Sequence, residues 1–231
     1  MKELLQPVSG YVLAGGRSSR MGTDKALMRF QGMPLIQRAV EKLRRICSEV
    51  AILGDRPELA RFGEVLPDRV PGRGPLGGIE TALHHASNEW ILLLPVDVPL
   101  VPGSMLQAWV WRTLRDEGAR PAACCFRVDG QLQPLVSLLH QQLAPYVTAA
   151  LDEGERKVLS GLEAAALRVG GDPKGTRRGG LRVESLEDES WKSLWRPTKL
   201  QVATKHLWFS NVNTPEEFNS VETQVIEAKR H

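Results

Sequence analysis

Three basic residues and a pair of glycines lie close together near the start of the chain. Arg17, Arg20 and Lys25 follow Gly15-Gly16, and the apolar stretch 11–14 precedes them. Adjacent glycines lack side-chain bulk and adopt positive φ, so their backbone N–H groups can approach a bound anion closely. We therefore predict a strand, a turn and a polyphosphate-binding loop. An ordinary tight turn followed by solvated basic residues is the alternative, because such turns are common at strand ends.

The two best-known phosphate motifs are absent from this loop. After Gly16 the spacing brings Met21 and Gly22 with no lysine behind them, which excludes the P-loop pattern. The dinucleotide-binding pattern of three spaced glycines is also missing. A nucleotide would therefore have to be held by a loop of another kind.

A single carboxylate, Asp97, stands out further along the chain. It follows the continuous apolar stretch 90–94 and is flanked by Pro95 and Pro99. A run of this kind is typical of a strand covered on both faces, and ligands of open α/β sheets bind at the carboxyl ends of strands. Because Mg²⁺ is usually held by one or two carboxylates plus substrate phosphates, we predict that Asp97 binds Mg²⁺. The alternative is that Asp97 caps the helix expected near Gly103.

A second glycine-rich loop spans residues 64–79 and leads into a helix. Asp68 lies inside this loop, and Gly77 and Gly78 lie near the start of the helix. A glycine-lined helix N-terminus offers unpaired N–H donors, and Asp68 would supply an acceptor beside them. By itself the loop fits a ligand site and a plain linker equally well.

Two asparagines follow an apolar run near the C-terminus. Residues 207–213 read as a strand that runs into a turn and a final helix, which would place Asn211 and Asn213 on one side of the extended chain. They could complete a metal or phosphate site. They could also be plain helix caps, the role that asparagine often plays before a helix.

The composition predicts one large α/β domain covering residues 1–231. The chain is 42% apolar and 25% charged, enough to bury a full core, and its net charge of +3 is too small to suggest nucleic-acid binding. A strand over residues 11–14, an amphipathic helix over residues 34–46 and a strand over residues 50–53 follow one another, which implies a right-handed crossover and a parallel sheet. The first residues and the apolar runs suggest neither export nor membrane insertion, so we expect a cytoplasmic protein.

Together these segments resemble the molybdenum cofactor guanylyltransferase (MobA) family of nucleotidyltransferases. The resemblance runs from about residue 11 to 218 and rests on five motifs in the expected order: Leu13-Ala-Gly-Gly-Arg-Ser-Ser-Arg-Met-Gly-Thr-Asp-Lys25, Gly74-Pro-Leu-Gly-Gly78, Pro95-Val-Asp-Val-Pro99, Gly154-Glu-Arg-Lys-Val158 and Asn211-Val-Asn-Thr-Pro215. It implies a single-domain, Rossmann-like three-layer sandwich with a mostly parallel sheet, similar to the nucleotide-diphospho-sugar transferases.

The resemblance also implies roles for individual residues. The GTP site would include Leu13, Ala14, Gly15, Gly16, Lys25, Asp68 and Asp97. Lys25, Arg20 and Asp97 would serve catalysis, and Asp97 would ligate Mg²⁺. Gly77, Gly78, Asn211 and Asn213 would lie near the phosphates and the acceptor, which for the asparagines reverses the expectation of plain caps. Where the family often has a polar residue after the second strand, this chain has Leu53-Gly54.

The Leu-Ala-Gly-Gly sequence resembles family members that use guanine, whereas cytosine users more often read Leu-Ala-Ala-Gly. Residues 170–205 form a longer insertion than a compact member would have. We expect a surface loop with a short helix there, or a basic flap formed by Lys174, Arg177, Arg178 and Arg182 over an anionic acceptor.

The implied reaction is the transfer of GMP from MgGTP to the terminal phosphate of molybdopterin or its molybdenum form, with release of pyrophosphate. Molybdoenzyme maturation proteins would be possible further partners. Three alternatives stay open at this point: a cytidylyltransferase, a nucleotide-binding chaperone of molybdoenzymes without chemistry of its own, and a sugar-phosphate nucleotidyltransferase.

Overall fold

The structure is a computed structural model that describes residues 5–15, 24–116, 121–170, 179–188, 191, 194–212 and 214–230. Its centre is a seven-stranded sheet with the order β5-β4-β1-β6-β8-β7-β9. The strands are β1 (Gln6–Leu13), β4 (Cys47–Leu53), β5 (Glu64–Leu66), β6 (Trp90–Pro95), β7 (Ala123–Val128), β8 (Gln131–His140) and β9 (Leu181–Ser185). Neighbouring strands are parallel except β8, which runs antiparallel to β6 and β7. The prediction of a mostly parallel α/β sheet is confirmed.

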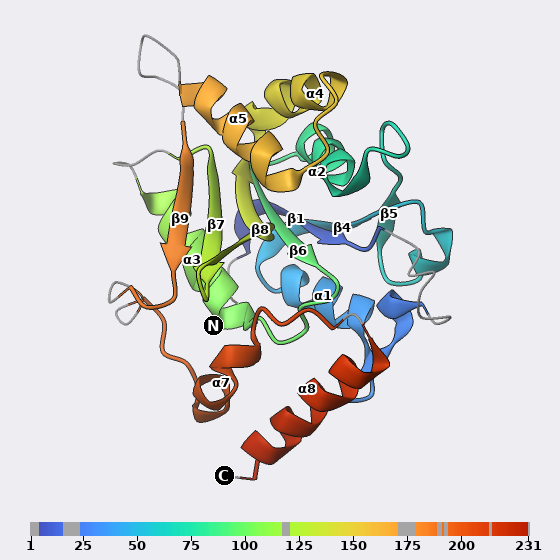
Figure 1. Ribbon diagram of the computed structural model, residues 1–231, viewed down its shortest axis with the longest axis vertical. Coiled ribbons are helices and arrows are strands. Elements are labelled where there is room, and N and C mark those ends of the chain that lie inside the picture. Colours follow the sequence, from blue (N-terminus) through green and yellow to red (C-terminus); the bar gives the residue numbers. More distant parts are fainter. Residues whose placement is uncertain are drawn as a thin grey trace.

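Helices cover both faces of this sheet and complete three layers (Figure 1). One face carries α1 (Leu35–Arg44), α3 (Gly103–Arg115) and α8 (Pro215–Ala228); the other carries α2 (Gly74–His85), α4 (Ala144–Asp152) and α5 (Val158–Gly170). Alternate residues of β6 enter the two cores: Leu92 and Leu94 pack on one side, Ile91 and Leu93 on the other. A strand buried on both faces needs apolar residues at every position, which explains the continuous run.

Short elements connect these layers. They are the 3₁₀ helices η1 (Lys25–Leu27), η2 (Pro57–Leu59), η3 (Gln141–Leu143) and η4 (Lys205–Leu207), the helix α7 (Lys199–Ala203), and the hairpin of β2 (Arg29–Phe30) with β3 (Met33–Pro34). Helix α8 packs on this hairpin through Phe218 and Phe30, whose ring centroids lie 5.5 Å apart. The backbone N–H of Gln31 donates to the carboxylate of Glu222 at 2.6 Å. The C-terminal helix thereby supports the segment that directly follows η1.

The first predicted helix is confirmed, since Leu35, Ile36, Ala39, Val40 and Leu43 are all buried on one face of α1. The strand after it is longer than predicted. We expected it to begin at residue 50, but β4 already begins at Cys47, which pairs with Gln6 of β1. Ser48 and Glu49 are polar, so a search for consecutive apolar residues does not find this part of the strand.

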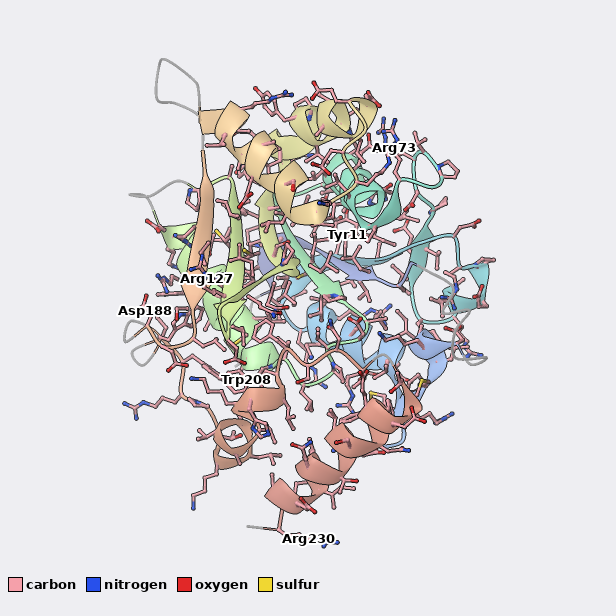
Figure 2. The ribbon with its side chains drawn as sticks, in the orientation of Figure 1. Tyr11, Arg73, Arg127, Asp188, Trp208 and Arg230 are labelled. Carbon is pink, nitrogen blue, oxygen red and sulfur yellow. The ribbon has the colours of Figure 1, made fainter. Side chains whose placement is uncertain are left out.

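The strand predicted over residues 207–213 is wrong. Leu207 ends the 3₁₀ helix η4, and the chain then runs irregularly to Val212, while Asn213 lies outside the described residues. Leu207, Trp208 and Phe209 are consecutive and all enter the same core (Figure 2 labels Trp208). A strand would send alternate side chains to opposite faces, so three neighbours that share one core require a turn instead.

The prediction of only a loop and a short helix over residues 170–205 also needs correction. β9 lies within this stretch and pairs in parallel with β7 at the edge of the sheet. Arg182, one residue of the hypothetical basic flap, belongs to β9 and forms ion pairs with Asp116 at 2.5 Å and Glu184 at 2.8 Å. Lys174, Arg177 and Arg178 lie outside the described residues. The single domain over residues 1–231 stays a prediction.

None of the helices in the described ranges is both long enough and apolar enough to span a lipid bilayer.

Candidate functional site

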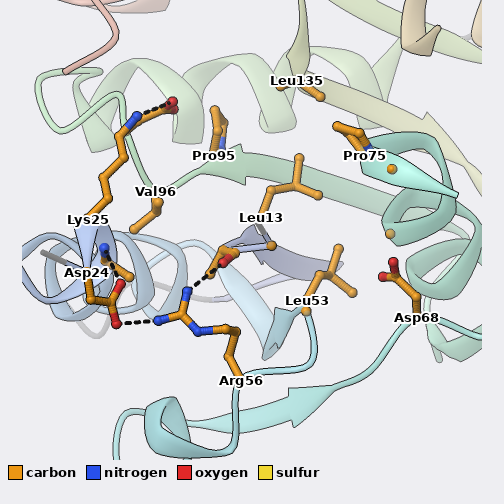
Figure 3. Close-up of a pocket in the computed structure, with 17 residues that line it drawn as sticks. Leu13, Asp24, Lys25, Leu53, Arg56, Asp68, Pro75, Pro95, Val96 and Leu135 are labelled. Carbon is orange, nitrogen blue, oxygen red and sulfur yellow. Dashed lines mark hydrogen bonds and ion pairs between the residues drawn. The ribbon is translucent and has the colours of Figure 1, made fainter. Parts of the chain in front are cut away.

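A cavity of about 300 Å³ opens at the carboxyl ends of β1, β4 and β6 (Figure 3). It lies where the topology of an open α/β sheet predicts a ligand. Its lining consists of Leu13, Ala14, Gly15, Asp24, Lys25, Ala26, Leu53, Gly54, Arg56, Asp68, Gly74, Pro75, Gly78, Pro95, Val96, Asp97 and Leu135. Both glycine-rich loops and the predicted metal ligand therefore meet in one place.

Lys25 and Asp97 face each other in this cavity. The Lys25 ammonium lies 2.9 Å from a carboxylate oxygen of Asp97, and the two side chains are 16% and 23% exposed. Lys25 is positioned by η1, whose N-cap Asp24 accepts a hydrogen bond from the backbone N–H of Ala26. The end of β6 is aligned with β1 by a hydrogen bond from Val96 N–H to the Leu13 carbonyl. Two residues far apart in sequence thus bring opposite charges to one point.

The segment around Asp97 is held from two further directions. The Val212 N–H donates to the carbonyl of Asp97 at 3.1 Å. The ammonium of Lys42, on α1, donates to the carbonyls of Pro99 at 3.1 Å and Val101 at 2.5 Å. Burial, with a smaller contribution from the positive charge of Arg38, lowers the pKa of Lys42 to about 7. The loop that carries Asp97 is therefore tied to α1 and to the C-terminal segment.

Arg56 is a pocket residue that the sequence analysis missed. Its guanidinium is buried, forms an ion pair with Asp24, donates to the Ala14 carbonyl at 3.3 Å and contacts Glu58 at 2.5 Å (Figure 3). Ala14 directly follows β1, and Asp24 precedes Lys25. One guanidinium therefore ties the end of β1 to the residue before Lys25. A buried arginine with three partners is suited to positioning.

The turns after β1 and β4 lie against each other. A Cβ on Gly54, whose φ is +130°, would lie 3.0 Å from the Cα of Gly15. This contact and this φ require glycine at position 54. Leu13 and Leu53 lie side by side between the polar groups in Figure 3. Where the family often has a polar residue after the second strand, this chain has the apolar side chain of Leu53 beside Leu13, and Gly54 packed against Gly15.

The opposite side of the cavity is formed by the second glycine-rich loop. Gly72 and Gly74 adopt positive φ of +81° and +65°, and α2 begins at Gly74. A Cβ built on Gly77 or Gly78 would lie 3.8 or 3.7 Å from the carboxylate of Asp68, so this carboxylate lies beside the first turns of the helix. Burial raises the pKa of Asp68, and the negative charges of Glu80 and Asp55 raise it further. The structure therefore places the Asp68 carboxylate beside the start of α2, as expected, and its role as an acceptor stays a prediction.

Arg73 holds the second glycine-rich loop in place through ion pairs with α2 and α4. Its guanidinium contacts the buried Glu80 at 3.2 Å and Asp152 of α4 at 2.5 Å, and Figure 2 shows it at the edge of α2. Gly77 lies under Arg73, where an added Cβ would come within 2.6 Å of the Arg73 Cβ. Gly77 therefore supports the loop, whereas Gly78 lines the cavity itself.

The remaining predicted site residues divide into two groups. Asn211 is exposed and precedes Val212, whose N–H reaches Asp97, so it lies next to the Asp97 segment without lining the cavity. Gly16, Arg20 and Asn213 lie outside the described residues.

Asp97 fits a magnesium ligand by its chemistry. It places a carboxylate beside the cavity, and Mg²⁺ commonly takes one or two carboxylates together with substrate phosphates. Within the described ranges there is no cluster of three histidine, cysteine or acidic side chains that could hold a metal by protein ligands alone. A cation at Asp97 would take its other ligands from substrate phosphates and water, as Mg²⁺ commonly does.

Comparisons with known proteins identify the family of this chain. Residues 10–167 match the family described as the MobA-like NTP transferase domain. A molybdenum cofactor guanylyltransferase from Serratia proteamaculans is 38% identical over 171 residues, which are 71% of this chain and 83% of the relative. A probable molybdenum cofactor guanylyltransferase from Carboxydothermus hydrogenoformans is 35% identical and is covered over 77% of its length by 67% of this chain.

Solved structures show the same fold. Molybdopterin-guanine dinucleotide biosynthesis protein A from Archaeoglobus fulgidus superimposes with a TM-score of 0.70 at 21% identity, over 95% of this chain and all of that one. A putative glucose-1-phosphate thymidylyltransferase from Bacillus anthracis reaches a TM-score of 0.65 at 12% identity, over 94% of this chain and 95% of that one. The cavity, the matched residues and the shared architecture lead to one conclusion: this chain is a nucleotidyltransferase of the MobA-like NTP transferase family.

Proposed function

We propose that this enzyme transfers GMP from GTP to the terminal phosphate of molybdopterin or its molybdenum form. The products are the guanine dinucleotide cofactor and pyrophosphate. The observation that carries the proposal is the meeting of Lys25 and Asp97 between two glycine-rich turns at the carboxyl end of the sheet. Relatives at 33–38% identity that are named molybdenum cofactor guanylyltransferase support the choice of donor and acceptor.

The reaction needs no general base from the protein. The second pKa of a phosphate monoester is about 6, so the acceptor is mostly dianionic at neutral pH. One of its oxygens forms a bond to the α-phosphorus in line, the bond from that phosphorus to the bridging oxygen breaks, and pyrophosphate leaves with the electron pair. No covalent enzyme intermediate is involved. Catalysis then consists of positioning and of neutralising charge on the phosphates.

Lys25 is the residue that we assign to the leaving pyrophosphate, with Arg20 as a second cation. Asp97 would hold Mg²⁺, which when bound supplies positive charge to the phosphate oxygens. Lys25 and Arg56 are the described cations that line the cavity, and they differ in how well they could bind phosphate. Arg56 is buried among three protein partners and acts on the backbone, whereas Lys25 belongs to an ion pair at the rim.

The second side of the cavity is assigned to the base. Asp68 can accept hydrogen bonds from the N–H groups of guanine, and the backbone at Gly78 leaves room for a ring. Leu13 and Leu53 supply an apolar surface for stacking, while Ala14, Gly15 and Gly16 would follow the sugar and phosphates. Asn211 and Asn213 are assigned to the acceptor phosphate because their segment reaches the backbone of Asp97.

The proposal is tested by measuring pyrophosphate release from each nucleoside triphosphate, with and without molybdopterin. We expect release only with GTP, a divalent cation and the acceptor together. Release with CTP in place of GTP would identify a cytidylyltransferase, and release with a sugar phosphate as acceptor would redirect the assignment. Tight GTP binding without any release would identify a non-catalytic chaperone of molybdoenzymes.

A further inference from the structure

The Lys25–Asp97 ion pair joins the two side chains to which the proposed function gives different ligands. Lys25 is assigned to phosphate and Asp97 to the cation, yet the two groups lie 2.9 Å apart and neutralise each other. Neither can serve its ligand fully while it keeps this partner. The exchange of partners must therefore be part of binding.

The surroundings allow the side chains to separate while their backbones stay in place. The start of η1 is fixed because Asp24 caps it and pairs with Arg56. The backbone of Asp97 is fixed by Val212 N–H. Long side chains on anchored backbones can change partners by rotation about single bonds. Asp24 differs from Asp97 in that both of its carboxylate oxygens have protein partners, the guanidinium of Arg56 and the backbone N–H of Ala26.

We propose that this ion pair couples the binding of the divalent cation to the binding of the nucleotide, so that each ligand binds weakly without the other. A cation alone would have to share Asp97 with the nearby ammonium. A triphosphate alone would meet the carboxylate of Asp97 beside the ammonium that it needs. When both bind, the charges alternate from Lys25 to phosphate to cation to Asp97, and every neighbour is of opposite sign. Coupling of this kind is reciprocal by thermodynamic linkage.

The proposal rests on the assignment of GTP and a divalent cation to this cavity, and it makes an unusual prediction. Removing one member of the pair should improve the binding of the other member's ligand when that ligand is alone. Lys25→Met should tighten Mn²⁺ binding to the nucleotide-free protein by about tenfold, one decade in Kd. Asp97→Asn should tighten the binding of metal-free GTP by about tenfold and should abolish the gain that Mn²⁺ gives the wild type.

The experiment is a set of binding titrations without acceptor. Mn²⁺ is titrated into each protein and free Mn²⁺ is followed by electron paramagnetic resonance, while GTP binding is measured by calorimetry with EDTA and with Mn²⁺. Lys205→Met and Glu187→Gln are matched controls, because these residues form an ion pair of 2.7 Å outside the cavity lining. Both controls should bind Mn²⁺ and GTP as the wild type does.

The outcomes separate this inference from the proposed function. If the wild type fails to bind GTP even with Mn²⁺, the nucleotide site itself is wrong. If the wild type binds GTP with Mn²⁺ but Lys25→Met binds Mn²⁺ no better than the wild type, only the coupling is overturned. Circular dichroism and thermal unfolding check that each variant folds. If Lys25→Met fails to fold, Lys25→Gln replaces it. The Asp97→Asn titrations test the coupling independently of Lys25.

Discussion

The two sides of the cavity differ in how they are made. The charged wall, formed by Asp24, Lys25, Arg56 and Asp97, draws its residues from three separate segments and holds them in ion pairs. The glycine wall, formed by Asp68, Gly74, Pro75 and Gly78, comes from one continuous loop and the start of α2. Figure 3 shows Lys25 and Arg56 on one side of Leu13 and Asp68 on the other.

This difference suggests a division of labour. Charged side chains can move with the phosphates as the charge on the phosphates changes during transfer. Substitutions in the charged wall should therefore reduce turnover. The glycine wall consists of backbone and one carboxylate, which recognise the shape and the hydrogen-bonding groups of the base. Substitutions there should therefore weaken the affinity for GTP and the selectivity for its base. Substitutions in the two walls, in the seam between them and in the loop after Asp97 should therefore differ in the quantity that they change and in the size of the change.

Asp97→Ala should give the largest loss. It removes the assigned cation ligand from the charged wall, and we expect turnover to fall to below about one thousandth of the wild type. The fold should remain, because the side chain lies at the rim and is 23% exposed. Pyrophosphate release measures the loss, and the thermal unfolding midpoint is the control. Near-normal transfer would remove Asp97 from the charged wall.

Lys25→Ala should cost about 10²–10³-fold in kcat, the usual loss when one preorganised transition-state donor is removed. The KM for GTP should change less than kcat if Lys25 acts mainly on the leaving pyrophosphate. Lys205→Ala is the control because its ammonium is paired with Glu187 away from the cavity lining. A loss of only a few fold in steady-state kinetics would contradict the role assigned to Lys25.

Gly54→Ala probes the seam between β1 and β4, on which both walls depend. The added Cβ would come within 3.0 Å of the Gly15 Cα at a φ of +130°. Strain of this kind costs about 1–3 kcal/mol, which urea denaturation should show as a lower free energy of unfolding. Gly63→Ala is the matched control, since its Cβ would meet no atom closer than 3.4 Å. Equal stability of the two variants would contradict the close approach.

Asp68→Asn should affect the glycine wall. We expect the KM for GTP to rise about tenfold while kcat changes little, because a half-buried carboxylate with two acceptor oxygens is replaced by an amide with one. The raised pKa of Asp68 adds a pH dependence, since the carboxyl takes up a proton at a higher pH than an ordinary aspartate. The wild-type KM should therefore rise on acidification, and that rise should be absent from Asp68→Asn. A fall in kcat with an unchanged KM would assign Asp68 to turnover instead.

Lys42 should give the smallest effect, on stability. Its pKa falls from 10.5 to about 7 on folding, so between these values the unfolded chain binds more protons and the free energy of unfolding rises with pH. Because a single group titrates, the slope cannot exceed about 1.4 kcal/mol per pH unit. Lys42→Met should flatten the slope in urea titrations between pH 7 and 8. In this range the buried Cys124, with its pKa raised to about 12, contributes little.

A slope that is the same in Lys42→Met and in the wild type would contradict the assigned cause. A loss of activity in Lys42→Met at constant stability would show that the loop after Asp97 belongs to the charged wall.

The sequence was sufficient for the parts of the fold that repeat a simple pattern. The buried face of α1 and the doubly covered strand β6 follow directly from apolar spacing. β9 could not be predicted, because an edge strand with alternating polar residues resembles a loop. The run at Leu207 was misread because its three apolar residues share one core around a turn.

The candidate site shows the same limit. Lys25, Asp68, Asp97 and the glycines lie in motifs whose residue types suggest their chemistry, and the structure brings them to one cavity. Arg56 was missed because its importance comes from partners that are distant in sequence, Ala14 and Asp24. Its position in the turn after the second predicted strand was the available signal. Their assigned roles in binding and catalysis stay predictions.

The hydrogen bond from Val212 to Asp97 has a consequence for how the protein is made. Its two residues come from the loop after β6 and from just before α8, so it cannot form until residue 212 has been synthesised. Domains generally begin to fold from the N-terminal side during translation. We expect strands β1, β4, β5 and β6 to assemble first during synthesis, and the backbone of the acidic residue at the edge of this sheet to be held in place only after residue 212 has left the ribosome.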